Sequence, residues 1–160
     1  MKITEALPGI VCERGISDAS NMGAAMAPAA ISTFKRYFSE SESSPEDFDM
    51  IVTGDLGYEG GKILCELMKN EGIEFGKSYT DCGMMIYSRE TQDVHSGGSG
   101  CGCSASVLAS YILPKLRRGE LKNVLFAATG AMMSPSSVQQ GLTIPAIAHL
   151  LHFEAESEEE

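Results

Sequence analysis

The sequence has few basic residues. It contains 12 Lys and Arg against 22 Asp and Glu, which gives the 160 residues a formal net charge of -10. Five of the acidic residues are glutamates between positions 154 and 160, so the rest of the chain is only mildly acidic. Nucleic-acid phosphates require concentrated Lys and Arg, and the one dense basic segment is residues 115–122. This argues against a nucleic-acid-binding protein, and we interpret the segment as the solvated end of a helix.

Paired cysteines and long apolar runs are also missing. The five cysteines are odd in number and scattered, and no secretory signal precedes them, so we expect a reduced, cytosolic protein without disulfides. Cys101 and Cys103 have one residue between them and no second pair, a spacing that does not predict a zinc site. No apolar stretch is long enough to cross a bilayer, so any membrane association is expected to be peripheral.

The composition is that of a globular protein. Hydrophobic residues make up 43% of the chain and charged residues 21%, and 160 residues can bury a substantial core. We predict one folded domain over residues 1–153. The acidic tail over residues 154–160 is predicted to be disordered.

The first 40 residues predict a strand followed by a helix. Residues 7–16 have moderate β character and lead into a polar cluster. Between positions 22 and 38 apolar side chains recur every four residues, which places them on one helical stripe. Because proline breaks an interior helical turn, regular helix is expected to begin at or near Pro28.

The remaining pattern alternates short apolar runs with amphipathic stretches. Strands are predicted at residues 48–53, 82–87, 123–129 and 143–153. Helices are predicted at residues 60–71 and 105–118. The second helix has Ser104 as its N-cap and a kink or an early end at Pro114. The resulting order, β-α-β-α-β-α-β-β, is typical of an α/β fold.

The most unusual segment is residues 97–104 (GGSGCGCS), with four glycines immediately before a predicted helix. Backbone N–H groups clustered at a helix N-terminus favour an anion without any charged side chain. Cys101 and Cys103 are either reactive thiolates there or small side chains that fill a tight turn. Asp55 follows the strand at 48–53 at its carboxyl end, where open α/β sheets bind ligands, and either caps the next helix or approaches a bound cation.

Several near-literal motifs carry a resemblance to a known family. They are residues 21–30 (NMGAAMAPAA), 97–105 (GGSGCGCSA), 127–131 (AATGA), 139–141 (QQG) and 144–149 (IPAIAH). On these motifs the chain resembles the C-terminal half of the stage V sporulation protein AD family, over nearly its whole length up to Phe153. The resemblance implies a thiolase-like half, a five-stranded mixed sheet covered by helices. It also implies an N-terminal half of similar size, so we expect this chain to be a fragment or one part of a split protein.

The resemblance implies binding of dipicolinic acid, or its calcium chelate, for accumulation in the forespore, by a non-catalytic protein without cofactor or metal. The residues expected to line the ligand pocket are Gly98, Ser99, Gly100, Cys101, Ser104 and His95. The expected partners are the N-terminal thiolase-like half, membrane proteins of the same sporulation system and a second copy of the chain, since a half-fold leaves apolar helices such as residues 22–38 uncovered. The expected location is cytoplasmic, peripheral at the forespore inner membrane.

Two other functions stay open. Thiolase-type enzymes use a nucleophilic cysteine in the first half, and a loop histidine and often a late-strand cysteine in the second. Here Gly or Cys occupies the histidine position, His95 lies earlier, and the late-strand position falls at Ala127 or Ala128. One alternative is an acyl-thioester condensing enzyme whose nucleophile lies on a missing N-terminal half; the other is a structural half that binds no ligand. His149 and His152 are predicted to point to opposite faces of the last strand and therefore not to form a metal site.

Overall fold

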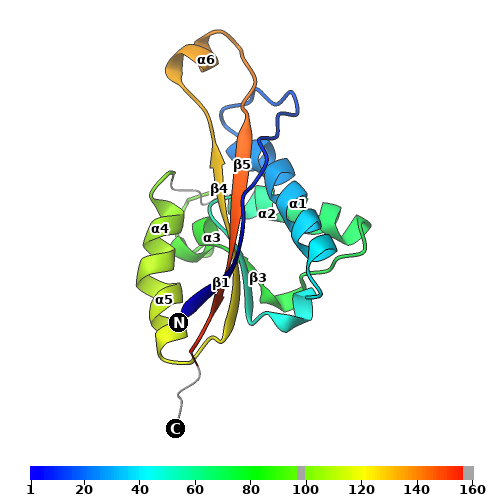
Figure 1. The fold of residues 1–160 in the computed structure, drawn as a ribbon. Coiled ribbons are helices and arrows are strands. Elements are labelled where there is room, and N and C mark those ends of the chain that lie inside the picture. Colours follow the sequence, from blue (N-terminus) through cyan, green and yellow to red (C-terminus); the bar gives the residue numbers. More distant parts are fainter. Residues whose placement is uncertain (97–99, 157–160) are drawn as a thin grey trace.

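The computed structural model describes residues 1–96 and 100–156, which form one mixed β-sheet with helices around it (Figure 1). The strands are β1 (Lys2–Leu7), β2 (Met50–Thr53), β3 (Tyr79–Asp81), β4 (Asn123–Ala131) and β5 (Ala146–Glu154). They lie in the order β1-β5-β4-β2-β3. Strand β2 is parallel to β3 and β4, whereas β5 is antiparallel to β4 and β1. The predicted α/β class with a five-stranded mixed sheet is confirmed.

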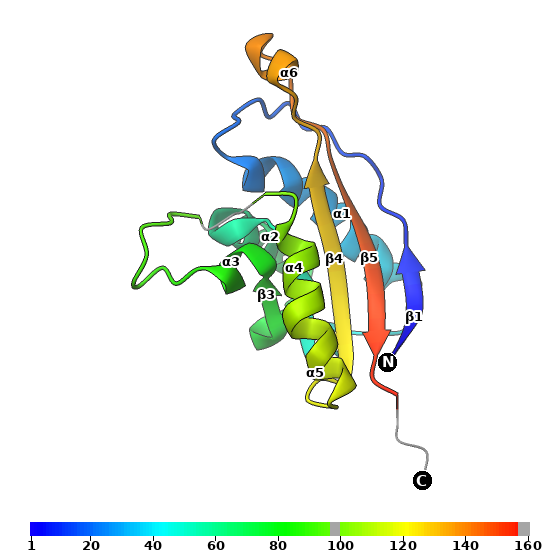
Figure 2. The same cartoon turned by 90° about the vertical axis from the view of Figure 1, so that its left-hand side faces the viewer.

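Helices cover both faces of this sheet (Figures 1 and 2). The long helices α1 (Met22–Glu40) and α2 (Gly57–Asn70) lie on one face. On the other face lie α3 (Cys82–Ile86) and a helical rod formed by α4 (Cys103–Val107), a π-helical turn (Leu108–Ile112) and α5 (Leu113–Arg117). The short helix α6 (Pro135–Gln139) stands at the end of an arm between β4 and β5, and single 3-10 turns occupy Pro45–Asp47 and Gly76–Ser78. None of the helices in the described ranges is long and apolar enough to span a membrane.

The two faces of the sheet have separate hydrophobic cores. Successive side chains of a strand point to opposite faces, so Ile51 and Leu125 belong to the core under α1 and α2. Their neighbours Val52 and Phe126 belong to the core under α3, α4 and α5. All four side chains are at most 3% exposed, which explains why these strands are continuous apolar runs in the sequence.

Two predicted strands differ from the structure. The strand predicted at residues 7–16 lies instead at Lys2–Leu7, because Pro8 has no N–H to donate to the ladder, and beyond it only Cys12 forms an isolated bridge, with Ala146. The strand predicted at residues 82–87 is the helix α3. The Asp81 side chain accepts hydrogen bonds from the first backbone N–H groups of that helix and so starts a helical turn where the strand ends.

Pro28 and Pro114 both lie within helical segments. Helix α1 begins at Met22, six residues before Pro28, with Asn21 accepting a hydrogen bond from the Ala24 N–H. The prediction that regular helix begins at Pro28 is therefore wrong: the turns around Pro28 are buried against the sheet, and this packing outweighs the loss of one helical hydrogen bond. At Pro114 the predicted distortion takes the form of the π-helical turn, in which the Leu113 N–H donates to the Leu108 carbonyl.

The apolar stripe of α1 is covered within this chain. Met26, Ala30 and Phe34 are buried in the core, and Phe34 packs edge-on against Phe75 at a centroid distance of 5.0 Å. The expectation that a half-fold leaves this stripe uncovered is therefore wrong. Exposed apolar side chains occur instead on the arm that carries α6, including Met132 (76% exposed), Met133, Val138 and Leu142.

Helices α1 and α2 cross at two glycines. A Cβ on Gly60 would lie 2.7 Å from the Gly23 Cα, and a Cβ on Gly23 would lie 2.4 Å from the Leu56 carbonyl oxygen. These distances are shorter than any contact that a methyl group can make, and the neighbouring atoms are backbone. The crossing therefore requires glycine on both helices.

We predict that Gly60→Ala destabilises the fold although alanine is the better helix former, because the added methyl group forces α1 and α2 apart. The expected loss in the free energy of unfolding is about 2 kcal/mol or more, measured by urea denaturation. The control is Gly102→Ala, since a Cβ at Gly102 meets no atom within 4 Å. Equal midpoints for the two variants would contradict the close crossing.

Candidate functional site

A pocket of about 660 Å³ opens at the carboxyl ends of β2 and β4. Its walls come from the start of α1, the turn from β2 into α2, the segment at 94–96, the approach to α4 and the last residues of β4. The carboxyl ends of parallel strands are where open α/β sheets bind ligands, because the helices that follow them diverge there. The structure thus places a pocket of ligand-binding size at the predicted edge of the sheet.

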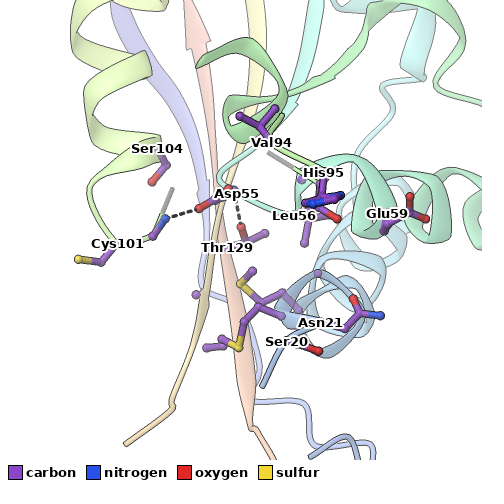
Figure 3. Close-up of a pocket in the computed structure, with 18 residues that line it drawn as sticks. Ser20, Asn21, Asp55, Leu56, Glu59, Val94, His95, Cys101, Ser104 and Thr129 are labelled. Carbon is purple, nitrogen blue, oxygen red and sulfur yellow. Dashed lines mark hydrogen bonds between the residues drawn. The ribbon is translucent and has the colours of Figure 1, made fainter. Parts of the chain in front are cut away.

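Asp55 lies in the middle of this pocket (Figure 3). Its backbone N–H donates to the Thr129 hydroxyl at 3.0 Å, which ties the end of β2 to the end of β4. Its carboxylate Oδ2 accepts the Gly100 N–H at 2.9 Å, which ties the same turn to the glycine-rich segment. Gly100 has a φ of +89°, a conformation that favours glycine. Asp55 therefore holds three walls of the pocket together. The prediction that it caps the next helix is wrong, because Leu56 occupies the cap position of α2 and the first N–H groups there donate to Asp81.

Four of the six predicted site residues line the pocket. Cys101 and Ser104 lie on the side of α4, and His95 lies on the opposite side (Figure 3). Gly100, directly before Cys101 in the chain, also lines the pocket. The other two, Gly98 and Ser99, are outside the described residues. The structure brings the four together, and their binding of a ligand stays a prediction.

The local roles of two of these residues differ from expectation. Ser104 is not the N-cap of its helix, because α4 begins one residue earlier at Cys103 and Gly102 occupies the cap position. Ser104 is thereby in the first turn of α4, where it faces the pocket. The His95 side chain is 91% exposed, lies 3.6 Å from the Asp93 carboxylate and sits on backbone with a φ of +43°. Its ring is thus at the rim of the pocket.

Sequence reasoning missed the contribution of α1. Asn21, Met22 and Met26 line the pocket opposite α4, together with Thr129 at the end of β4. The first three belong to the motif at 21–30 and Thr129 to the motif at 127–131. Both motifs were available as signals, but only the fold shows that they meet at one edge of the sheet.

A buried carboxylate, that of Asp81, holds the turn from β2 into α2 that lines the pocket. Asp81 is fully buried and accepts five hydrogen bonds, from the Thr53 hydroxyl at 2.6 Å and from four backbone N–H groups, those of Leu56, Gly57, Gly83 and Met84. Burial raises the pKa of Asp81, the bonds from Thr53, Leu56 and Gly57 lower it, and the charge of Asp55 raises it. Since Thr53 donates its one hydroxyl hydrogen to Asp81, the Tyr79 hydroxyl donates to Thr53.

The cysteines differ in accessibility. Cys101 is exposed in the pocket, whereas Cys82 and Cys103 are buried. Burial raises the pKa of the Cys65 thiol to about 11 and that of Cys82 further still. Within the part of the chain that the structure describes, Cys101 is thus the one thiol that a ligand in the pocket would shield and a reagent can reach freely.

The charged side chains of the pocket are mainly acidic. Asp55 and Glu59 line it, and His95 is the only basic side chain among its described residues. Any anion bound here must therefore be held by backbone N–H groups and hydroxyls, or carry a cation with it. The two histidines of β5 lie elsewhere: His149 accepts the Gly9 N–H, and His152 lies 3.3 Å from the Glu5 carboxylate.

Two comparisons with known proteins point to the same family. The family model described as "Stage V sporulation protein AD" matches residues 1–154. The chain is 46% identical over 154 residues to the stage V sporulation protein AD of Bacillus subtilis (strain 168). This match covers 96% of the chain and 45% of that relative, so the chain spans somewhat less than half of the relative's length.

We predict that Asp81→Asn destabilises the protein by about 2–4 kcal/mol, because the amide nitrogen would face N–H donors and leave buried groups unpaired. Urea denaturation measures the change. Asp47→Asn is the control, since Asp47 accepts comparable hydrogen bonds from Ser44 on an exposed 3-10 turn. An Asp81 variant no less stable than the Asp47 variant would show that the five bonds do not organise the fold.

Proposed function

Because the chain belongs to the stage V sporulation protein AD family, we propose that it is a non-catalytic sporulation protein that binds dipicolinic acid or its calcium chelate. In this proposal it serves the accumulation of that ligand in the forespore. Its relative is named as a sporulation protein and not as an enzyme. The observation that carries the proposal is the pocket at the carboxyl edge of the sheet, which the glycine-rich segment helps to form.

The size and lining of the pocket suit a small planar acid. Its 660 Å³ lies within the range of about 300–1,000 Å³ typical of small-molecule sites. Ser104 and Thr129 supply hydroxyl groups, and Met22 and Met26 supply an apolar wall for an aromatic ring. The Gly100 and Cys103 N–H groups already donate within the chain, so in this proposal a carboxylate is held by the other backbone N–H groups at the start of α4.

The acids of the pocket bear on the form of the ligand. Asp55 and Glu59 repel a bare dicarboxylate, but a calcium ion in the chelate accepts carboxylate oxygens readily. The Asp55 Oδ2 already accepts a hydrogen bond from the Gly100 N–H. A chelated calcium that approaches this side would therefore be attracted by groups that would oppose the free acid.

The partners and location are also part of the proposal. The matched relative is more than twice as long as the matched region, so we propose that an N-terminal thiolase-like half completes the thiolase-like fold. Membrane proteins of the same sporulation system and a second copy of the chain are further proposed partners, at the inner membrane of the forespore. The exposed apolar side chains of the α6 arm, Met132, Met133, Val138 and Leu142, provide surface for such pairing.

We predict that Cys101→Trp weakens dipicolinate binding at least about tenfold in isothermal titration calorimetry, with and without calcium, because the indole fills the pocket. Ser110→Trp is the matched control, since Ser110 is exposed on the same helical rod but does not line the pocket. Dipicolinate should also slow alkylation of Cys101 by iodoacetamide while leaving half-buried Cys12 unaffected. Binding that is equal in both tryptophan variants, without protection of Cys101, would refute the proposed site.

The absence of thiolase-type chemistry is proposed from the same pocket. His95 is directed to solvent at the rim, and the late-strand position is taken by Ala127 or Ala128 on β4, which cannot attack a carbonyl or transfer a proton. The competing function is an acyl-thioester condensing enzyme whose nucleophile lies on a missing N-terminal half.

We predict that incubation of the chain with acetyl coenzyme A leaves its intact mass unchanged, because alanine occupies the late-strand position on β4 and the His95 ring is exposed at the rim of the pocket. Iodoacetamide in a parallel sample shows that Cys101 is accessible. An acetyl adduct mapped to a cysteine would favour the condensing enzyme.

A further inference from the structure

A second, smaller pocket lies beside the first. It has a volume of about 300 Å³ and is formed by Tyr58 of α2, the end of α3 and the loop that follows it, which extends away from the sheet (Figure 2). Ser96 lines both pockets, and the Tyr58 N–H donates to the Ser96 carbonyl at 2.8 Å. The two pockets are thus neighbours on either side of one backbone segment.

Two cations gather on one ring of this smaller pocket. The Arg89 guanidinium carbon lies 3.6 Å from the centroid of the Tyr58 ring, and the Lys62 ammonium nitrogen lies 5.0 Å from it. Both distances are within the range of cation–π attraction. Because both are measured to one centroid, the two charges are no further apart than the two distances combined, which is comparable to the Debye length of about 8 Å at physiological ionic strength. Their mutual repulsion is therefore only partly screened.

Neither cation forms an ion pair with a carboxylate of the described residues. Half of the 12 Lys and Arg side chains form ion pairs within the described residues, but Arg89 and Lys62 are not among them. Glu59 and Glu66 lie three and four residues from Lys62 on α2, at spacings that permit an ion pair, yet neither makes one with it. In an acidic chain, this places one cation without an ion pair, Arg89, in the lining of the smaller pocket and a second, Lys62, over the Tyr58 ring that forms one of its walls.

We propose that this pocket binds a small oxyanion, a carboxylate or phosphate group, at the Arg89 guanidinium, with the charge of nearby Lys62 adding to the attraction. Stacking on Tyr58 orients the flat face of the Arg89 guanidinium toward the ring, so its N–H edge is available for a bidentate contact with such a group. Tyr58 and Tyr87 provide aromatic walls, and the Ser88 side chain adds a hydroxyl. Glu90 also lines the pocket and opposes an anion, so we expect a Kd of about 1 mM.

The proposal is tested by NMR titration of the chain with inorganic phosphate and, separately, with sodium benzoate, each up to about 10 mM. The expected result is a saturable shift of the Arg89 side-chain N–H signal with at least one probe. Benzoate alone would indicate a carboxylate held between the tyrosine rings, and phosphate alone would indicate a phosphate group. No saturable shift with either probe would overturn the proposal.

Matched variants separate a site from general charge attraction. Arg89→Gln should weaken binding of the effective probe at least about tenfold, because one of the two cations and the bidentate edge are lost. Arg14→Gln is the control, since Arg14 is exposed, forms no ion pair with a described residue and lines neither pocket. Equal weakening in both variants would overturn the proposal. The calorimetric test with Cys101→Trp reports on the larger pocket, so either proposal can fail without the other.

Discussion

The buried carboxylate of Asp81 is the contact on which this architecture depends. Five hydrogen bonds converge on it from the end of β2, the start of α2 and the start of α3. These three segments meet at the same edge of the sheet; the end of β2 contributes the Thr53 hydroxyl, and the starts of α2 and α3 contribute backbone N–H groups that donate to Asp81. The Asp81 carboxylate accepts all five of these hydrogen bonds, so it fixes the direction in which α2 and α3 leave the sheet. The pocket forms in the space that the diverging helices leave.

Two glycines, Gly83 and Gly54, allow the close contacts that position Asp55 in the pocket. A Cβ on Gly83 would lie 2.2 Å from the Asp55 Oδ1, so Asp55 can approach the start of α3 only because position 83 has no side chain. A Cβ on Gly54 would lie 2.8 Å from the Thr129 N, so the contact between the ends of β2 and β4 has the same requirement. Asp55 can therefore reach both Thr129 and Gly100, and its position depends on backbone contacts that larger residues would prevent.

Much of this fold could be predicted from the sequence, and the failures have a common cause. The runs at 50–53 and 123–131 are strands because a parallel strand buried on both faces must be apolar throughout. The run at 82–87 is equally apolar but is a helix, because a short apolar run fits both states and only the capping carboxylate decides between them. The glycine-rich segment was recognisable as a candidate site by its composition, and its residues Gly100, Cys101 and Ser104 do line the pocket. The contribution of Asn21 and Met26 depends on how α1 crosses the sheet, which no local pattern encodes.

The first turn of α2 contributes one residue to each of the two pockets. Successive residues of a helix point about 100° apart, so Tyr58 and Glu59 face different pockets although they are adjacent in the chain. Asp55 and Glu59 supply two acidic side chains to the larger pocket, whereas Arg89 and Glu90 line the smaller one and Lys62 lies over the ring of Tyr58. The backbone at 94–96 separates them, and the contact between Gly57 and the Ser96 carbonyl is too close for any side chain at position 57. The Arg89 guanidinium, at which we propose that an oxyanion binds, therefore lies across this segment from the acidic pair Asp55 and Glu59.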